Sequence, residues 1–196
     1  KTFQNPLDYP VTVQFIIVHA ERNNKRFAGV FADRNGKGVF IMEIKRICQS
    51  QWNDVKNIYM EAFPKSERKP FFFLKCAVQK GKSEIWVASQ SDVVAGFIVL
   101  IPYYDMVLVE YLAVSNQIRS KGSGSKILGE ICRQYDDKRI LLLIEKIDET
   151  ANNLEQRIAR KRFYLKNGFE SSGVLMQGVS GDMEILCHGG SISGDE

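Results

Sequence analysis

The stretch that decides the fold runs from Val109 to Leu128 and reads VEYLAVSNQIRSKGSGSKIL. It begins like a buried strand, passes through two glycines among small polar residues, and ends in an apolar helical pattern. The first four amides of a helix have no partner within the helix, and the helix dipole adds partial positive charge there. A loop of this kind with basic residues around it indicates a site for an anionic group such as phosphate.

The two glycines of this loop allow two interpretations. In the first, the main-chain amides of Lys121–Ser125 point at the ligand, because Gly122 and Gly124 let it approach the chain closely. Arg119 and Lys126 would then add positive charge. In the second, the glycines merely form a tight turn before the helix. The loop alone does not decide between them.

A nearly continuous apolar run follows the helix at residues 139–145, as expected for a central strand buried on both faces. Strand, loop, helix and strand form a crossover unit, so we expect residues 107–115 and 139–145 to lie parallel. The neighbouring strands should be antiparallel. The sequence therefore predicts an α/β fold with a mixed, mostly antiparallel central sheet, one parallel strand pair and helices on both faces.

The rest of the chain supplies the other elements of this sheet and its helices. Further strands are predicted at residues 42–47, 83–89, 93–102, 169–178 and 182–188. Helices are predicted from Ser50, which can cap its first turn, through Phe63, and from about Asn153 to Asn167, where Gly168 follows.

These elements belong to one domain, residues 42–188. Residues 1–41 contain no amphipathic helix and are interpreted as an extension, either a β-hairpin or a segment added to the natural chain. Residues 189–196 are polar and rich in glycine and serine, which predicts a flexible tail.

Composition argues against several classes of partner. With 27 Lys and Arg against 23 Asp and Glu, the formal charge of +4 is too diffuse for a nucleic-acid-binding protein. No apolar stretch approaches the roughly 18 residues of a membrane span. The four cysteines lie far apart, as in a reduced cytoplasmic protein, and the two histidines at opposite ends argue against a metal site.

Other nucleotide and hydrolase motifs fit poorly. Gly81-Lys82-Ser83 ends like a P-loop, but Cys76 stands where the earlier glycine belongs. Ile127 stands where the dinucleotide-binding GxGxxG motif needs a glycine. A nucleophile elbow of the form GxSxG is missing from the sequence.

An ordered set of motifs joins the glycine loop to RFYLKNGF at residues 162–169. The set consists of Arg119-x-x-Gly122-x-Gly124 between a strand and a helix, then Tyr164, then Gly168-Phe169. In this order the motifs resemble the GCN5-related N-acetyltransferase (GNAT) superfamily, and EAFPKSERKP at residues 61–70 resembles a subset of its bacterial members. The resemblance covers about residues 42–188. Each motif alone is weak, but the ordered set is fairly specific.

The resemblance implies that acetyl-CoA is the cosubstrate and that no metal is required. The glycine loop would hold the pyrophosphate. The strand ending at Val114 would splay from its parallel neighbour, freeing main-chain groups of Leu112 and Val114 to pair with pantetheine. Buried amides in such a gap would be costly if nothing occupied it. The implied cosubstrate-binding residues are Leu112, Ala113, Val114, Arg119, Lys121, Gly122, Ser123, Gly124, Ser125 and Lys126.

Two residues are candidates for the chemistry, which in this family is direct attack of a neutral amine on the thioester. An alkyl amine has a pKa of about 10, so a base must remove a proton near neutral pH. Glu110, which strand alternation places on the face of Leu112 and Val114, is the candidate base, or merely a polar residue near a strand end. The Val114 amide would stabilise the developing oxyanion. Tyr164 matches the family's general acid, with aromatic packing beside Phe163 as the alternative.

One position departs from the family pattern. Many members have an Asn seven residues before the Tyr, where this chain has Arg157. Arg157, Arg160, Lys161 and Arg162 could contact the phosphates of the cosubstrate, but a solvated basic helix face is the favoured interpretation.

The sequence therefore predicts an enzyme, an acetyl-CoA-dependent N-acetyltransferase acting on a primary amine of a small molecule, a peptide N-terminus or a lysine. The alternative is a non-catalytic acyl-CoA-binding sensor on the same fold. We expect the first helix, residues 64–70 and the turn Tyr103–Asp105 to build the acceptor site, with Glu61, Glu67 and Asp105 to attract a cation. We also expect a bacterial cytoplasmic protein without nucleic-acid or membrane partners, and a homodimer, as is frequent in the family.

Overall fold

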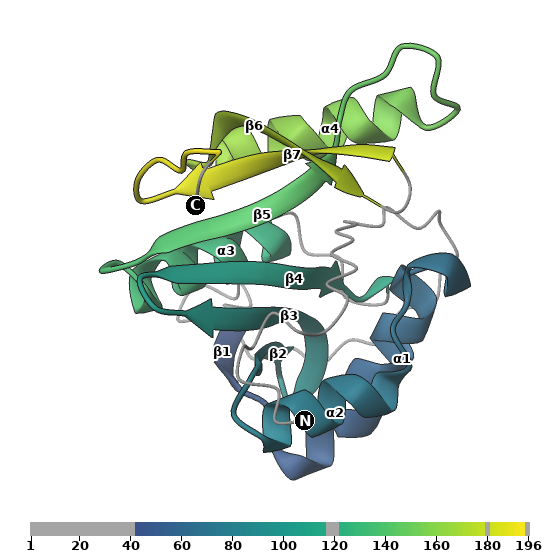
Figure 1. The fold of residues 1–196 in the computed structure, drawn as a ribbon. Coiled ribbons are helices and arrows are strands. Elements are labelled where there is room, and N and C mark those ends of the chain that lie inside the picture. Colours follow the sequence, from purple (N-terminus) through teal and green to yellow (C-terminus); the bar gives the residue numbers. More distant parts are fainter. Residues whose placement is uncertain (1–41, 117–121, 179–180, 195–196) are drawn as a thin grey trace, which may run out of the picture.

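The computed structural model describes residues 42–116, 122–178 and 181–194, so the predictions for residues 1–41 lie outside the described residues. The strands form a seven-stranded sheet in the order β1-β2-β3-β4-β5-β7-β6 (Figure 1). They are β1 (Met42–Arg46), β2 (Glu84–Gln90), β3 (Val93–Tyr103), β4 (Met106–Val114), β5 (Arg139–Glu145), β6 (Glu170–Gly178) and β7 (Gly181–His188). β4 and β5 are parallel and the other neighbouring pairs are antiparallel. The predicted sheet is confirmed.

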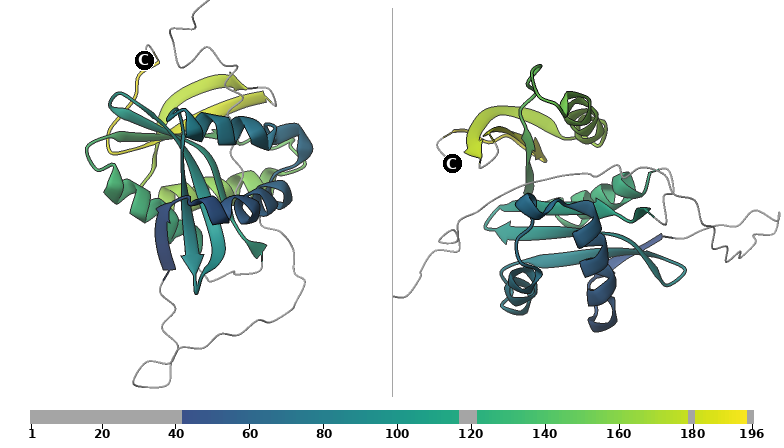
Figure 2. Two further views of the ribbon diagram at one scale, coloured as in Figure 1. Left: turned by 90° about the horizontal axis from the view of Figure 1, so that it is seen from below. Right: turned by 90° about the vertical axis from the view of Figure 1, so that its right-hand side faces the viewer.

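Helices cover both faces of this sheet, as predicted (Figure 2). The four α-helices of the described chain are α1 (Trp52–Ala62), α2 (Phe71–Gln79), α3 (Ser123–Gln134) and α4 (Leu154–Lys166). Short 3₁₀ turns, η1 (Gln49–Gln51) and η2 (Lys65–Glu67), precede α1 and α2. α1 and α2 pack on one face, and α3 and α4 pack on the other.

Each face of the sheet has its own apolar core. On the α3 and α4 face, Ile127 and Tyr164 pack with strand residues such as Leu142. On the α1 and α2 face, the buried cluster includes Val55, Tyr59, Leu74, Phe97 and Tyr111. Burying one large apolar side chain stabilises the fold by roughly 1.5–3 kcal/mol, so the two clusters fix both helix layers against the sheet.

The start of α1 differs from the prediction. Ser50 does not cap the helix, because the chain first makes the η1 turn and α1 begins only at Trp52. The capping interaction belongs to η1 instead, where the Cys48 main-chain amide donates to the Gln51 side-chain oxygen at 3.0 Å. The end of α4, by contrast, is within one residue of the prediction, and Gly168 follows it with a φ of +82°.

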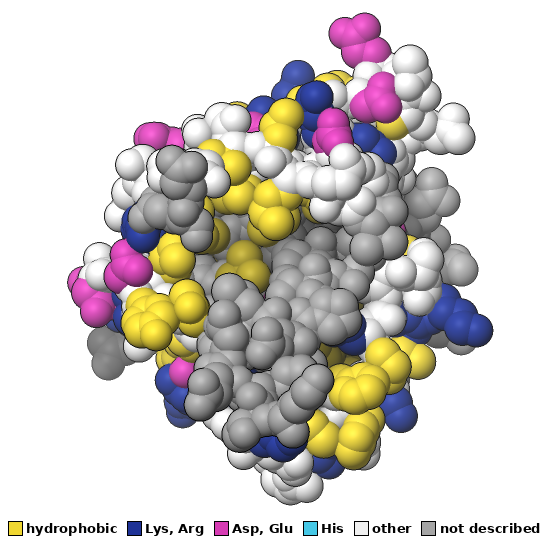
Figure 3. All heavy atoms as spheres, in the orientation of Figure 1, with side chains coloured by type: hydrophobic (Ala, Val, Ile, Leu, Met, Phe, Trp, Pro, Cys, Tyr) yellow, Lys and Arg dark blue, Asp and Glu magenta, His cyan; other side chains and the backbone are white. Residues whose placement is uncertain are grey.

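α2 is a helix that the sequence patterns do not predict. Leu74 is its one buried residue, so the segment lacks the apolar stripe by which a surface helix is recognised. Its first turn leaves Phe72 and Phe73 exposed, and Met60 of α1 is exposed as well. Apolar side chains accordingly gather on the surface over α1 and α2 (Figure 3).

Three global features bear on function. In the described ranges, no helix combines the length and apolar character needed to span a membrane. The same ranges contain no group of three or more His, Cys, Asp or Glu side chains placed to hold a metal ion. All four cysteines are free thiols.

Candidate functional site

The centre of the site is the place where β4 and β5 part. Their parallel pairing extends only from Met106 opposite Arg139 to Leu108 opposite Leu141. Beyond that point β4 continues to Val114 with β3 as its partner, while β5 continues with β7. The two strands therefore form a V that is closed at their amino ends and open at their carboxyl ends (Figure 1). The predicted splay is confirmed.

The hydrogen bonds of β4 show which of its main-chain groups face the open side. The Ser115 amide donates to the Ala95 carbonyl at 2.7 Å, so it points to β3. Successive amides of a strand point to opposite sides, and the pairing with β3 is regular over this part of β4. The amides of Leu112 and Val114 therefore point away from β3 and toward the opening of the V. Ala113 lies between them, with its side chain buried on the α1 face.

The amino end of α3 begins just after this opening. Gly122 caps the helix with a φ of +102°, a left-handed conformation that glycine adopts without strain, and its carbonyl accepts the Lys126 amide at 2.9 Å. Gly122 has no side chain that could cap the helix, and a helix amino end of this kind offers main-chain amides to an anion. Ser123 is buried there, and Ser125 and Lys126 follow in the same turn. Arg119 and Lys121 lie outside the described residues.

Gly124 has a different role from Gly122. A Cβ at this position would lie 3.1 Å from Cζ of Phe163 on α4 and 3.9 Å from Cγ2 of Val114 on β4. Glycine therefore lets the first turn of α3 pack closely against α4 and the end of β4. The two glycines serve the turn and the packing, and together they bring the amides of the helix terminus to the mouth of the V.

Glu110 does not share a face with Leu112 and Val114, and this prediction is wrong. In the register of β3 and β4, Val99 lies opposite Tyr111 and Leu100 lies opposite Val109, so Glu110 is the extra residue of a β-bulge. The bulge interrupts the alternation. Val109 and Leu112 are consequently both in the core below α3, whereas Tyr111 is in the core below α1.

The Glu110 side chain is buried in an ion pair. Lys69 Nζ lies 2.5 Å from Glu110 Oε1, and the Glu110 side chain is 3% exposed. The segment that carries Lys69 is anchored by two tyrosines of the α1 core. Tyr59 donates its hydroxyl to the Lys69 carbonyl at 3.0 Å, and Tyr111 donates to the Glu67 carbonyl at 3.3 Å. The connection between α1 and α2 is thus held over β4.

Tyr164 on α4 is fully buried, and its hydroxyl has no hydrogen-bond partner among the described residues. Its ring packs edge-on against Phe163 and Phe169. Burial raises the pKa of the Tyr164 hydroxyl above its ordinary value, and the nearby positive charge of Arg160 partly opposes this shift. The side chain therefore combines an aromatic packing role with a buried hydroxyl whose raised pKa keeps it protonated near neutral pH.

Three basic residues of α4 form ion pairs with the sheet instead of a solvated face. Arg160 Nη1 lies 2.7 Å from Glu145 Oε2 at the end of β5, and Arg157 Nη2 lies 3.1 Å from the other oxygen of that carboxylate. Lys161 contacts Glu184 on β7 at 2.8 Å. Burial raises the pKa of Glu145, but the hydrogen bonds and charge of these arginines outweigh it and leave the pKa below its ordinary value. The favoured interpretation of the sequence was wrong for these three residues because their carboxylate partners are distant in the chain.

Glu67 is a candidate functional residue for which the sequence predicts only the attraction of a cation. Its Oε2 atom is buried without a hydrogen-bond partner. Burial, followed by the negative charge of Glu145, raises the pKa of Glu67, while Arg160 lowers it. The motif PKSERKP includes Glu67, but nothing in its spacing shows that the fold carries this carboxylate to residues of β5 and α4.

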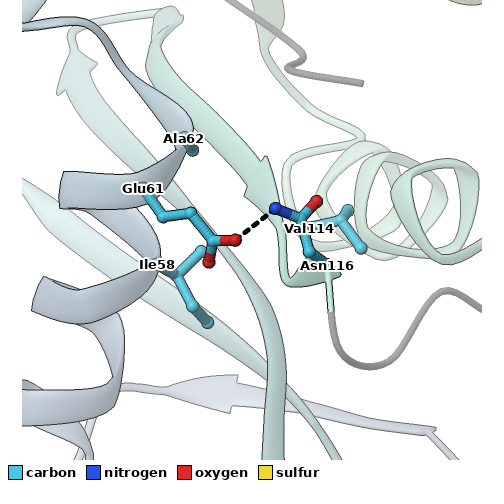
Figure 4. A pocket seen from close by; sticks show the side chains of 5 residues that line it. All are labelled: Ile58, Glu61, Ala62, Val114 and Asn116. Carbon is cyan, nitrogen blue, oxygen red and sulfur yellow. Dashed lines mark hydrogen bonds between the residues drawn. The ribbon is translucent and has the colours of Figure 1, made fainter. Parts of the chain in front are cut away.

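A shallow hollow lies between α1 and the end of β4. It is lined by Ile58, Glu61, Ala62, Val114 and Asn116 (Figure 4). The Asn116 amide donates to the Glu61 carboxylate across it. α1 and β4 thus bound this hollow at the open end of the V, next to the Val114 main chain, where the sequence places part of an acceptor site.

The turn Tyr103–Asp105, by contrast, is not near this opening. It joins β3 to β4 at the closed end of the V, where Asp105 Oδ2 lies 2.7 Å from Arg139 Nη2. Its position at the closed end weighs against the prediction that this turn helps to build the acceptor site, which stays a prediction. Its carboxylate secures the start of β5 instead.

Comparison with known families agrees with this geometry. Residues 81–171 match a family model described as an acetyltransferase (GNAT) domain. This match covers the glycine loop, Tyr164 and Gly168-Phe169, the ordered motifs on which the resemblance to the GNAT superfamily is based. No curated protein matches the chain.

Solved structures share the fold at low sequence identity. A GNAT-family protein from Bacteroides thetaiotaomicron has a TM-score of 0.63 at 20% identity, over 79% of this chain and 90% of the other. Naa50 from Arabidopsis thaliana, in complex with the bisubstrate analogue CoA-Ac-MVNAL, has a TM-score of 0.54 at 19% identity. The match covers 74% of this chain and 97% of Naa50. The aminoglycoside 6′-N-acetyltransferase from Enterococcus faecium has a TM-score of 0.58 at 16% identity, over 74% of this chain and 96% of the other. The fold is therefore compatible with very different acceptors.

Proposed function

We propose that this protein is an acetyl-CoA-dependent N-acetyltransferase that transfers the acetyl group directly to a primary amine. The match of residues 81–171 to an acetyltransferase (GNAT) domain supports the class of reaction. The observation that carries the proposal is the open V, in which the amides of Leu112 and Val114 face a gap that begins where β5 stops pairing with β4. The amino end of α3 lies beside that gap.

The residues at the V suit the two parts of this cosubstrate. A pantetheine arm carries amide groups, and the main chain of Leu112 and Val114 can pair with them as with an added strand. A diphosphate suits the amides from Gly122 to Lys126, because a helix amino end favours negative charge. Arg119 and Lys121, which lie outside the described residues, would contribute further positive charge in this proposal.

Catalysis in this proposal uses charge stabilisation and proton transfer. The Val114 amide stabilises negative charge on the carbonyl oxygen as the amine attacks. Tyr164 gives a proton to the departing sulfur, a role supported by its buried hydroxyl, which has no partner and whose raised pKa keeps it protonated near neutral pH. Glu110 stays a prediction for the base. Its ion pair with Lys69 weighs against that role, because the ammonium group already occupies one oxygen.

The acceptor in this proposal is a small-molecule amine, a peptide N-terminus or a lysine. Residues 42–188 form the catalytic domain of a cytoplasmic bacterial enzyme, with a homodimer as its expected assembly. The hollow at Glu61 and the neighbouring α1–α2 connection border the open end of the V, and both are the expected contacts of the acceptor.

The test has two steps. Isothermal titration with acetyl-CoA should show one site per chain, while ATP should give no heat of binding. A thiol-release assay should then detect free CoA with at least one member of a panel of polyamines, arylalkylamines, aminoglycosides and N-terminal peptides. Binding without turnover on any member would favour the acyl-CoA sensor, and failure to bind acetyl-CoA would contradict both functions.

A further inference from the structure

Three buried side-chain atoms in the described chain lack any hydrogen-bond partner: Glu67 Oε2, Arg160 Nε and Tyr164 Oη. They come from two separate segments, the α1–α2 connection and α4. Arg160 and Tyr164 are four residues apart on α4 and so lie on the same side of that helix. The charge of Arg160 acts on both Glu67 and Tyr164, which places the three groups in one electrostatic environment.

Unpartnered buried polar groups are rare, because burying a donor or acceptor without a partner is unfavourable. Here their chemical types complement one another. Glu67 offers an acceptor, Arg160 offers a donor, and the Tyr164 hydroxyl can do either. An ammonium or amine nitrogen would suit the carboxylate, and a sulfur or carbonyl oxygen would suit the two donors. The cluster therefore matches the two reactants of an acyl transfer.

The two glutamates over β4 differ in their partners. Glu110 is paired with Lys69, and its side chain is 3% exposed. Glu67 lies two residues before Lys69, with its main chain fixed by Tyr111, but no donor reaches its Oε2. Lys69 therefore neutralises the charge of Glu110, whereas no ion pair within the described residues neutralises Glu67.

We infer that Glu67 is the general base that receives the acceptor amine, opposite Tyr164 as the general acid. This inference rests on the proposed function and names a residue that the sequence offered only as an attractant for a cation. Arg160, held by Glu145 through Nη1, adds positive charge to the surroundings of Glu67.

The reaction balances with these groups. Glu67 removes one proton from the ammonium group of the acceptor, and the neutral nitrogen then attacks the thioester carbon. The C–N bond forms and the C–S bond breaks, and the sulfur leaves with its electron pair. The departing sulfur takes the proton of the Tyr164 hydroxyl. The Tyr164 oxygen then receives the second proton that the amine nitrogen loses. Glu67 releases its proton to solvent, so each turnover yields one amide, one CoA thiol and one proton.

The pH profile follows from the surroundings of Glu67. The charged and titratable groups that act on it are Glu145 on β5, Arg160 on α4 and Tyr111 on β4. Burial and Glu145 hold the pKa of Glu67 above its usual range, with Arg160 opposing them. A base works only when deprotonated, so kcat/KM should fall as the pH drops through this raised pKa.

The decisive variant is Glu67→Gln, which keeps the size of the side chain and removes its basicity. Because the Glu67 Oε2 atom has no partner to lose, we expect the variant to fold, with a melting temperature within a few degrees of the wild type. Acetyl-CoA affinity should stay within about twofold by titration, while kcat/KM for the best amine of the panel should fall by about 10²–10³-fold. The acidic limb of the pH profile should disappear.

Two further variants make the result specific. Glu67→Asp retains a carboxylate and should keep the acidic limb at a reduced rate. Glu170→Gln, which removes an exposed carboxylate at the start of β6, should match the wild type in both assays. Wild-type turnover with an unchanged rate and pH profile in Glu67→Gln would overturn the inference and leave the proposed function intact. Absence of acetyl-CoA binding in the wild type would instead contradict the proposed function.

Discussion

The two ends of the β4–β5 pair differ in how completely their polar groups are used. At the closed end, Arg139 binds Asp105 and the Ser191 carbonyl, and Lys138 binds the Tyr104 carbonyl. At the open end, the hydroxyl of Tyr164 and one oxygen of Glu67 are buried without partners. At the closed end these hydrogen bonds hold the strands and the neighbouring turns together, which is a structural role. The open end has the unused hydrogen-bonding capacity of a ligand site.

Among further variants that compare the two ends, the largest effect should come from removing the unpartnered hydroxyl of Tyr164 at the open end. Tyr164→Phe keeps the ring packing and deletes only the proposed acid, so kcat should fall by about 10²-fold. The affinity for acetyl-CoA should stay within about twofold by titration. Equal turnover in the variant and the wild type would assign Tyr164 to packing alone.

A smaller effect is expected from the main chain of β4. Val114→Pro removes an amide that points to the open side rather than to β3, so the sheet should tolerate it. Losing one hydrogen bond of roughly 1–1.5 kcal/mol should weaken acetyl-CoA binding by about tenfold.

The matched control for that variant is Val114→Ala, which trims the side chain but keeps the amide. It should bind acetyl-CoA like the wild type in the same titration. If the alanine variant loses as much affinity as the proline variant, the side chain and not the main chain is responsible.

The closed end should respond in the opposite way. Arg139→Ala removes hydrogen bonds to Asp105 and to the Ser191 carbonyl, and should lower the free energy of unfolding by about 1–2 kcal/mol, since much of this network faces solvent. Acetyl-CoA affinity should not change once the variant is folded. Denaturant titration and calorimetry measure the two quantities separately, and a parallel loss of affinity would remove the distinction between the two ends.

The smallest effect is expected at Asp105 itself. Asp105→Asn should leave the KM for every amine of the panel within about twofold, because the carboxylate lies at the closed end and is 63% exposed. A steady-state assay with the best acceptor tests this. A large rise in KM would show that the turn Tyr103–Asp105 contributes to the acceptor site.

The sequence predicts the fold well where a pattern is local. The apolar run of β5, the glycine loop before α3 and Gly168 after α4 each follow from composition and spacing, and the crossover rule makes β4 and β5 parallel. α2 is not predicted from the sequence because Leu74 is its one buried residue. The pattern of a helix is visible only when its burial is one-sided and extensive.

The candidate site is harder to predict, because it depends on contacts between distant segments. Strand alternation places Glu110 with Leu112, but the bulge at Glu110 moves the carboxylate to the other side of the sheet, and no residue type marks a bulge here. Arg160 similarly looks solvated until β5 brings Glu145 to it. The proposed role of Glu67 depends on the α1–α2 connection, which is held over β4 by Tyr59 and Tyr111.

The central claim is that the open end of the V holds acetyl-CoA. The most direct test is the change in backbone amide resonances of ¹⁵N-labelled protein on titration with acetyl-CoA. The account predicts large shifts for Leu112, Val114 and the first turn of α3, with little change at Arg139. Shifts centred on the closed end, or none at β4 and α3 when the ligand is saturating, would contradict it.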